Sequence, residues 1–470
     1  MISIMLSEPF ELSGDDTFAY LQEVSRYSEW DDHVLESHQV DRGPIQIGTK
    51  FNVTYRILRQ ELTLYFVLSA LKPGRDVLLE AQHDHFQVQT RFTIDNQAKR
   101  LSWQTSVHFD GIWNNASPVL KTILKSELSR SFQKLVRALN PSKQVPDLPD
   151  LKTQIEDHLL IPGLLRFSRL GYQWETNCRY PVIRKLNKHH IVITGASSGI
   201  GEAAARQLAL LGADITIIAR NEIKAKASVN RLRQESHSRK KHRYILADLS
   251  LARDVDRTIG ELVKLDRPID CLINNAGYLY QERQETDEGI EKSFALLLMA
   301  PYRLTLGVKN LLKRAPLAQV INVSSGGMYT QRLKADHLTQ GLMPYDGTRT
   351  YAQLKRALVM LSELWAQEWE PDGILVHAMH PGWADTKSVA ETLPRFYQIT
   401  KAILRTPDEG ADTITWLASH PDLSRTNGRF WMDRRVHPTV LIPGTNPRKT
   451  DYQILKETLQ NFEPETPLPQ

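Results

Sequence analysis

Cysteine is nearly absent from this chain of 470 residues, which contains only Cys178 and Cys271. Two isolated cysteines cannot build a disulfide framework or a thiolate metal cluster, so we expect a reducing compartment and no structural metal. Long apolar runs are missing as well, because no uncharged stretch reaches the length of a membrane span. The start, MISIMLSEPFEL, has no basic cluster and meets acidic residues early, which argues against a secretory signal and favours a cytoplasmic protein.

A strong charge of either sign is also missing, since the net charge is only +5. This balance predicts an ordinary solvated surface and no nucleic-acid partner. The composition, with 41% hydrophobic and 24% charged residues, is that of a globular protein. A chain of 470 residues is too long for one core, so we expect two domains and a connector.

The stretch HIVITGASSGIG, residues 190–201, organises the second half of the chain. A β-branched apolar run predicts a buried strand, the glycines predict a tight turn, and the following EAAARQLALL predicts a helix. Gly195 would make the turn, Gly199 would let phosphates approach the backbone, and Gly201 would let helix and strand pack closely. This unit predicts a dinucleotide site, although spaced glycines alone also serve any tight turn.

Strand and helix patterns alternate after residue 190 and predict a doubly wound parallel α/β sheet. Ligands of such sheets bind at the carboxyl ends of the strands. After the first strand, we expect further strands at 214–219, 244–247, 271–274, 320–323, 375–380 and 429–432.

Four motifs lie in order along this half: TGxxxGxG from Thr194, NNAG at 274–277, the serine pair at 324–325 and YAQLK at 351–355. Together they resemble the short-chain dehydrogenase/reductase family over residues 190–433, which implies a Rossmann-type fold. HPGWADT, the insertion after VSSGGM and the ending GRFWMDRR resemble the branch typified by dehydrogenase/reductase SDR family member 12. The resemblance implies cofactor contacts from Thr194, Gly195, Ser197, Ser198, Gly199, Ile200, Gly201, Arg220, Asn221, Asp248, Leu249, Asn275, Ala276, Gly277, Tyr351, Lys355, Pro381, Gly382 and Thr386.

Arg220 stands directly after the second strand, where an NAD-preferring relative would place an acidic residue. A guanidinium can form paired hydrogen bonds with a 2′-phosphate, so we expect NADP(H) to be preferred, with NAD(H) possible. Alternatively, Arg220 stacks on the adenine or meets only solvent. By resemblance Asp248 would bind the adenine amino group, although an aspartate at this junction is also an ordinary helix cap.

Tyr351 and Lys355 are four residues apart in a helical pattern, so both side chains face the same way. Acid/base work near neutrality asks for a tyrosine pKa about 3 units below its usual value of about 10. The attraction of a lysine ammonium about 4 Å away is large enough, at about 4 kcal/mol, to lower the pKa by roughly 3 units. We therefore expect Lys355 to lower the Tyr351 pKa. Ser325, or alternatively Ser324, would hold the substrate oxygen. Ser325, Tyr351 and Lys355 are therefore the predicted catalytic residues.

The segment 381–386, PGWADT, follows the sixth strand and resembles the family's loop beside the nicotinamide, where Thr386 would hold the carboxamide. Trp383 either faces the substrate pocket or packs locally. The long stretch between Ser325 and Tyr351 is an insertion that could cover the pocket.

One position departs from the family pattern. The family's catalytic asparagine lies in a segment such as FxxNxxG, and the corresponding run here places Leu297 at that site. The asparagine holds a water that relays protons to the lysine, so an aliphatic side chain would break the relay. We expect activity to be reduced, rerouted or absent.

Residues 1–140 have mostly strand patterns, with a helix expected at 15–24 and a long amphipathic helix at 118–139. The order resembles the polyketide cyclase/START-like superfamily, an α+β helix-grip fold, and implies a lipid or other hydrophobic ligand. For Trp30, Phe66, Phe86 and Trp103, packing in an ordinary core is favoured over contact with a ligand. Residues 141–189 form a linker with an apolar, basic segment that packs between domains or touches a membrane surface. The catalytic domain then spans 190–470.

Two functions remain open from the sequence. The first is an NADP(H)-dependent oxidoreductase acting on a hydrophobic, lipid-like carbonyl or alcohol, with Tyr351 as the acid/base. The second is a nucleotide-binding lipid-binding or transfer protein with little turnover, because Leu297 replaces the asparagine. A homo-oligomer and peripheral membrane contact are possible in either case.

Overall fold

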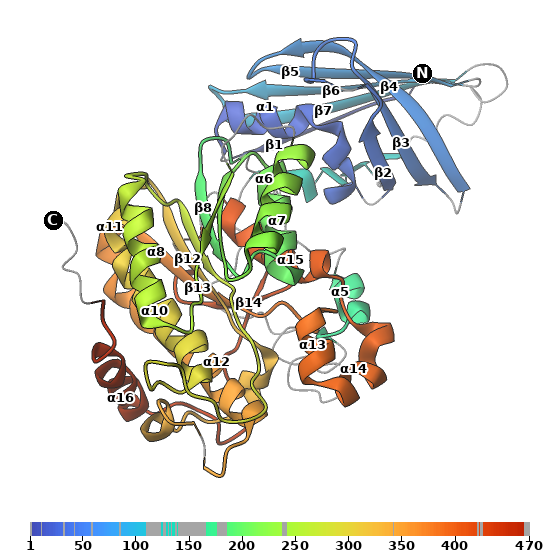
Figure 1. The fold of residues 1–470 in the computed structure, drawn as a ribbon. Helices are drawn as coiled ribbons and strands as arrows, with labels where there is room; N and C mark the ends of the chain where they lie inside the picture. The colour runs from blue at the N-terminus through green and yellow to red at the C-terminus, as the bar shows by residue number, and fades with distance from the viewer. Residues whose placement is uncertain are drawn as a thin grey trace. The chain divides into compact units, whose positions relative to one another are not determined.

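The computed structural model describes residues 2–10, 12–31, 33–41, 43–57, 60–83, 86–109, 166–175, 186–236, 242–341, 343–420, 423 and 426–464, together with 124–125, 128–129, 131–132, 134–136 and 139. The chain forms two compact units, Met1–Gln144 with Tyr180–Arg184, and Val145–Arg179 with Lys185–Gln470 (Figure 1). Most of the predicted linker, 141–165 and 176–185, lies outside the described residues. Its described parts, 166–175 and 186–189, belong to the second unit.

The first unit is built on a seven-stranded antiparallel sheet in the order β1-β7-β6-β5-β4-β3-β2. Its elements are β1 (Ile2–Pro9), α1 (Gly14–Gln22), η1 (Val24–Glu29), β2 (Val34–Gln39), β3 (Lys50–Ile57), β4 (Gln60–Lys72), β5 (Asp76–His83), β6 (Phe86–Asp95) and β7 (Arg100–Phe109). The described residues between 124 and 136 are helical, as the amphipathic pattern predicts. Turns join β4 to β5, where Gly74 adopts a φ of 66°, and β6 to β7, where Asp95 accepts from the backbone N–H of Gln97.

Aromatic side chains pack against one another in the interior of this unit. The rings of Trp30 and Trp103 meet edge to face at 5.5 Å, and Phe92 stacks on Trp103 at 5.4 Å. Trp30, Phe92 and Phe66 are buried. Burial of large aromatic rings is a main source of core stability, so these contacts favour the core-packing interpretation of Trp30, Phe66 and Trp103.

The second unit contains an eight-stranded sheet in the order β10-β9-β8-β11-β12-β13-β14-β15. Its strands are β8 (His190–Thr194), β9 (Asp214–Ala219), β10 (Arg243–Leu246), β11 (Cys271–Asn274), β12 (Ala318–Val323), β13 (Ile374–Met379), β14 (Phe430–Met432) and β15 (Arg435–His437). Strands β8 to β14 are parallel, which confirms the predicted doubly wound sheet.

The sheet also has an antiparallel edge strand, β15, that the sequence pattern did not indicate. It returns along β14 through Asp433 and Arg434, which have φ values of 51° and 61°. Two consecutive left-handed residues are typical of a tight hairpin turn, but this position usually carries asparagine or glycine. The turn therefore lacks its usual sequence signal.

Helices cover both faces of this sheet (Figure 1). The helices of the second unit are α5 (Arg169–Glu175), α6 (Gly199–Leu210), α7 (Glu222–Glu235), α8 (Ala252–Lys264), α9 (Lys292–Phe294), α10 (Ala300–Gly307), α11 (Lys309–Lys313), α12 (Gly347–Glu368), α13 (Lys387–Thr392), α14 (Pro394–Thr400), α15 (Pro407–Ser419) and α16 (Lys449–Gln460). Shorter turns are the π-helical η5 (Ala295–Met299) and the 3-10 helices η6 (Gly326–Thr330), η7 (Ala335–His337), η8 (Glu370–Asp372) and η9 (Lys401–Ile403).

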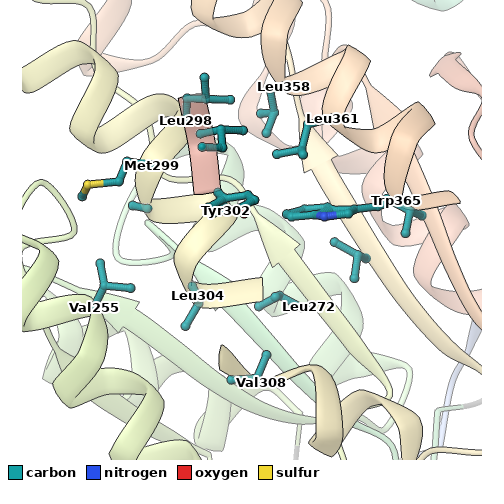
Figure 2. Packing of buried hydrophobic residues seen from close by; sticks show 14 of the residues in the cluster. Val255, Leu272, Leu298, Met299, Tyr302, Leu304, Val308, Leu358, Leu361 and Trp365 are labelled. Carbon is teal, nitrogen blue, oxygen red and sulfur yellow. The ribbon is translucent and has the colours of Figure 1, made fainter. Parts of the chain in front are cut away.

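A hydrophobic cluster holds α8, α10 and α12 against the sheet (Figure 2). Tyr302 of α10 stacks on Trp365 of α12 at 5.9 Å, and Leu298, Leu358 and Leu361 are buried around them. Removing a side chain from such a core costs about 2–5 kcal/mol, so this cluster fixes α12 against the sheet.

Candidate functional site

The glycine loop joins β8 to α6 and is held by the loop after β11. The backbone N–H groups of Asn275 and Ala276 both donate to the Thr194 hydroxyl at 2.9 Å. The Asn275 amide donates to the Thr194 carbonyl at 3.0 Å. Thr194 and Asn275, two of the predicted cofactor residues, therefore position each other before any ligand binds.

The loop glycines have two different roles. A Cβ on Gly195 would lie 2.8 Å from the Ala276 Cα, and one on Gly201 would lie 2.6 Å from the Gly195 carbonyl oxygen. Gly199 has a φ of 60°, and a Cβ there would meet only the Thr386 side chain, at 3.4 Å. Gly195 and Gly201 thus allow close backbone packing, while Gly199 leaves space at the start of α6.

The first turn of α6 provides backbone donors for an anion. Ser198 is its N-cap residue, and its side chain makes no capping hydrogen bond. The first N–H groups of a helix have no partner within the helix, and the helix dipole favours negative charge there. The space at Gly199 and these donors fit the pyrophosphate of a dinucleotide.

Arg220 follows β9, and its side chain is exposed, without a hydrogen bond or ion pair to other described residues. Asn221 caps α7 by accepting from the Lys224 N–H at 3.0 Å. Arg220 and Asp248 both act on the pKa of Tyr280, which burial raises to about 12, and Arg220 opposes that rise. Arg220, Asp248 and Tyr280 therefore lie near one another at the ends of β9, β10 and β11.

Asp248 does not cap the next helix. It accepts from the N–H and the hydroxyl of Ser250, at 3.0 Å and 2.7 Å. The N-terminus of α8 is capped instead by Glu288, which accepts from the Ala252 N–H at 2.6 Å. The helix-cap alternative is wrong because α8 begins four residues beyond Asp248, within reach of a carboxylate that is distant in sequence. Leu249 is buried in the core.

The serines after β12 have different partners. The Ser324 hydroxyl donates to the carbonyl of Lys355 at 2.9 Å, so it is engaged with α12. The Ser325 hydroxyl accepts from the Gly327 N–H at 3.3 Å, and it lies close enough to the Tyr351 hydroxyl to lower the Tyr351 pKa. Of the two candidates, Ser325 is the serine that lies at the Tyr351 hydroxyl.

Lys355 lies in the same site, but its ammonium donates to the Val323 carbonyl at 2.7 Å. Its Nζ is 5.8 Å from the centre of the Tyr351 ring. Burial raises the pKa of Tyr351 to about 12, and burial lowers that of Lys355 to about 8. The sequence predicts that Lys355 lowers the Tyr351 pKa, but burial raises that pKa instead. The Lys355 ammonium is directed at the Val323 carbonyl of the strand.

Leu297 lies beside this group and is completely buried. A Cβ on Gly277 would be 3.2 Å from Leu297 Cδ2 and 3.5 Å from Lys355 Nζ. Leu297 belongs to η5, a π-helical turn, and such turns often occur at functional sites. The register that placed Leu297 at the usual asparagine position therefore agrees with its surroundings.

The loop after β13 is fixed by Arg405. Arg405 forms a buried pair with Asp433 at 2.7 Å and 2.9 Å, and donates to the Pro381 carbonyl at 3.5 Å. A Cβ on Gly382, whose φ is 77°, would lie 2.5 Å from Arg405 Cδ. Thr386 caps α13 by accepting from Val389 at 3.3 Å. No sequence motif pointed to Arg405.

Trp383 packs locally with other aromatic rings. It lies 5.7 Å from Phe167 and 5.2 Å from Phe396, measured between ring centres. Phe167 comes from the segment predicted as linker, where no sequence signal marked it. Across the described ranges, no group of three His, Cys, Asp or Glu side chains could hold a metal, and no helix is long and apolar enough to cross a bilayer.

Comparisons with known proteins extend these observations. Residues 189–395 match the family model described as short chain dehydrogenase. The chain is 34% identical over 310 residues to dehydrogenase/reductase SDR family member 12 of Homo sapiens, covering 64% of this chain and 96% of that protein. It is 28% identical over 267 residues to polyprenol dehydrogenase of Mus musculus, covering 54% and 78%. A structure of L-sorbose reductase from Gluconobacter frateurii with NADPH and L-sorbose aligns with a TM-score of 0.45 at 24% identity, covering 53% and 97%.

Proposed function

This chain belongs to the short-chain dehydrogenase/reductase family, and on that premise we propose that it is an NADP(H)-dependent oxidoreductase that acts on a hydrophobic, lipid-like carbonyl or alcohol. The observation that carries the proposal is the gathering of Ser325, Tyr351 and Lys355 at the end of β12, where Ser325 acts on the Tyr351 hydroxyl and Lys355 donates to the Val323 carbonyl. Lys355 lies one turn further along the same helix, and the glycine loop lies at the same edge of the sheet. This is where open α/β sheets bind their ligands.

Tyr351 acts as the acid in this proposal. A phenol with a pKa of about 12 is protonated at neutral pH, so it can donate its proton to a carbonyl oxygen. Ser325 holds that oxygen by a hydrogen bond.

The residues of the glycine loop fit a nicotinamide dinucleotide. The open position at Gly199 and the uncapped start of α6 suit its phosphates, and Thr386 lies next to them. Such a cofactor supplies the hydride. The exposed guanidinium of Arg220 supports NADP(H) over NAD(H), because it can bind a 2′-phosphate without first breaking another ion pair among the described residues.

A lipid-like substrate is supported by two considerations. The similar mouse protein is named for a polyprenol, which is a long apolar alcohol. The first unit, which we propose is START-like, could supply such a molecule from its interior. Trp103 Nε1 is buried there without a hydrogen-bond partner among the described residues, so a ligand oxygen could engage it.

Leu297 supports a second candidate, a nucleotide-dependent lipid-binding or transfer protein with weak or no turnover. Its side chain borders Gly277 and Lys355, where a water relay would need a polar group. An aliphatic neighbour cannot pass a proton to Lys355. In this candidate the protein still binds the cofactor, but hydride transfer is slow.

Two measurements separate the candidates. Titration of the protein with NADPH and with NADH, followed by tryptophan quenching, tests the cofactor site; micromolar NADPH binding is expected and binding of neither contradicts both candidates. NADPH oxidation with long-chain aldehydes then tests the chemistry. Tyr351→Phe should lower kcat at least 100-fold, whereas Tyr65→Phe, on an exposed strand position, should leave it unchanged. Equal turnover by Tyr351→Phe contradicts the mechanism, and tight NADPH binding without turnover favours the second candidate.

A further inference from the structure

Phe167 brings a part of the chain before the parallel sheet to the carboxyl edge of that sheet. Its ring lies 4.9 Å from His380, 5.7 Å from Trp383 and 6.5 Å from Tyr329, between ring centres. Tyr329 follows β12 and Ser325, while His380 and Trp383 follow β13. The four residues Phe167, Tyr329, His380 and Trp383 form one aromatic cluster, called here the aromatic wall.

Backbone hydrogen bonds and Arg405 hold Phe167 in this place. The Trp383 N–H donates to the Phe167 carbonyl at 2.7 Å. Arg405 donates through Nε to the Ser168 carbonyl at 3.2 Å and through Nη2 to the Arg166 carbonyl. With its bonds to Pro381 and Asp433, the buried guanidinium uses all five of its N–H groups. Residues 166–168 are therefore tied to the same group that fixes the loop after β13.

His380 adds an unused polar group to the aromatic wall. Its Nδ1 accepts from the Gly326 N–H at 3.2 Å, so in the neutral ring Nε2 carries the hydrogen. Nε2 is buried and has no hydrogen-bond partner among the described residues. Gly326 directly follows Ser325, and a Cβ there would lie 2.9 Å from Nε2. A buried N–H without an acceptor is costly, so a bound ligand with an oxygen at this point would gain a hydrogen bond.

We propose that Phe167 is a specificity-determining residue, and that the aromatic wall binds the apolar body of the substrate beside Ser325. Residues 166–175 are then a part of the oxidoreductase site and not a spacer. The proposal rests on the proposed function for the reaction. It adds that substrates with a long apolar body depend on Phe167 more than short ones do, because the apolar area that a substrate buries against the ring increases with the length of its chain.

The test compares NADPH-linked reduction of decanal and propanal by the full chain. Phe167→Ala should raise KM for decanal about tenfold while KM and kcat for propanal stay within twofold. The control, Leu170→Ala, removes an apolar side chain that is 55% exposed on the same segment and should behave as the wild type. Phe167→Leu, which keeps an apolar side chain, should give an intermediate KM for decanal.

A merely structural role gives a different result. Phe167→Ala would then lower Tm and reduce activity toward both aldehydes by the same factor, which overturns the proposal. No change toward either aldehyde also overturns it. The NADPH Kd should be unchanged in the variant, since the ring of Phe167 packs on Tyr329, His380 and Trp383.

Decanol binding separates this proposal from the proposed function. If the wild type reduces neither aldehyde, the proposed function fails. Decanol binding can then still be measured through the fluorescence of Trp383. That signal is assigned by its loss in Trp383→Phe. A tenfold weaker decanol Kd in Phe167→Ala then supports the aromatic wall. An unchanged Kd, or no decanol binding by the wild type, contradicts it.

Discussion

The ammonium of Lys355 donates to the carbonyl oxygen of Val323 at 2.7 Å, and this contact joins α12 to the end of β12. Lys355 is only 3% exposed, so the charge lies in a poorly solvated site. Because the ammonium faces this carbonyl, Lys355 does not lower the Tyr351 pKa as the sequence predicts. The lysine stabilises the strand end and keeps a lowered pKa, while the tyrosine beside it stays protonated.

Replacing Lys355 by methionine should stabilise the protein at neutral pH. Burial lowers the pKa of Lys355 to about 8, so the unfolded chain binds more protons than the native one between about pH 8 and 10.5. The destabilisation is therefore complete below about pH 8 and disappears toward pH 10.5. Allowing for the lost hydrogen bond, Lys355→Met should gain roughly 2 kcal/mol at pH 7 in urea unfolding, with loss of activity. Lys224→Met, on an exposed position, should show no pH-dependent gain. An equal gain at pH 7 and pH 10 would contradict this explanation.

Gly382→Ala should unfold or distort the loop after β13. The new Cβ would overlap the Arg405 guanidinium and would also require a left-handed backbone. Gly373→Ala is a matched control, because Gly373 has a φ of 70° but no atom within 4 Å of a Cβ. The control should cost about 1 kcal/mol in urea unfolding and keep NADPH affinity, whereas Gly382→Ala should cost about 3 kcal/mol or more and weaken NADPH binding. Equal costs for the two variants would mean that the loop can move away from Arg405.

Arg220→Asp should change the cofactor preference. One charge-assisted contact to a 2′-phosphate becomes a repulsion, so the ratio of NADPH to NADH affinity should fall more than tenfold, about 1.4 kcal/mol. Separate titrations of the two cofactors by tryptophan quenching measure the ratio. Arg75→Asp, an equal charge change at an exposed position in the first unit, should leave it unchanged. If the ratio does not move in Arg220→Asp, another residue binds the phosphate.

Acid should destabilise the second unit through histidines that are buried in neutral form. Burial lowers the pKa of His377 and His380 to about 3 and that of His190 to about 4. The unfolded chain binds protons at these positions from about pH 6.5 downward, so stability is lost as pH falls from 6.5 toward 3. Each histidine contributes up to about 1.4 kcal/mol per pH unit to that slope. His190→Gln should flatten the slope measured in urea, and His38→Gln, on an exposed strand, should not.

Local patterns were sufficient for much of the fold. The β-branched run at 191–193, the alternating strands of the first unit and the helix that carries Tyr351 all lie where the periodicity predicts them. The edge strand β15 was not predictable, since three residues carry no periodicity and its turn uses Asp433 and Arg434. The cap of α8 was not predictable for a related reason. Asp248 precedes this helix in the sequence, but the capping carboxylate belongs to Glu288, which is 36 residues from Ala252 at the helix start.

The sequence by itself determined the doubly wound sheet, the glycine loop and the spacing of Tyr351 and Lys355, because these depend on local periodicity and turn chemistry. Only the tertiary structure decided which serine lies nearer to the Tyr351 hydroxyl, where the Lys355 ammonium points, and that Phe167 and Arg405 lie against the loop after β13. Those outcomes depend on desolvation and on contacts between distant segments. Such contacts arise when β12, β13 and α12 come together, and no local stretch of sequence encodes them.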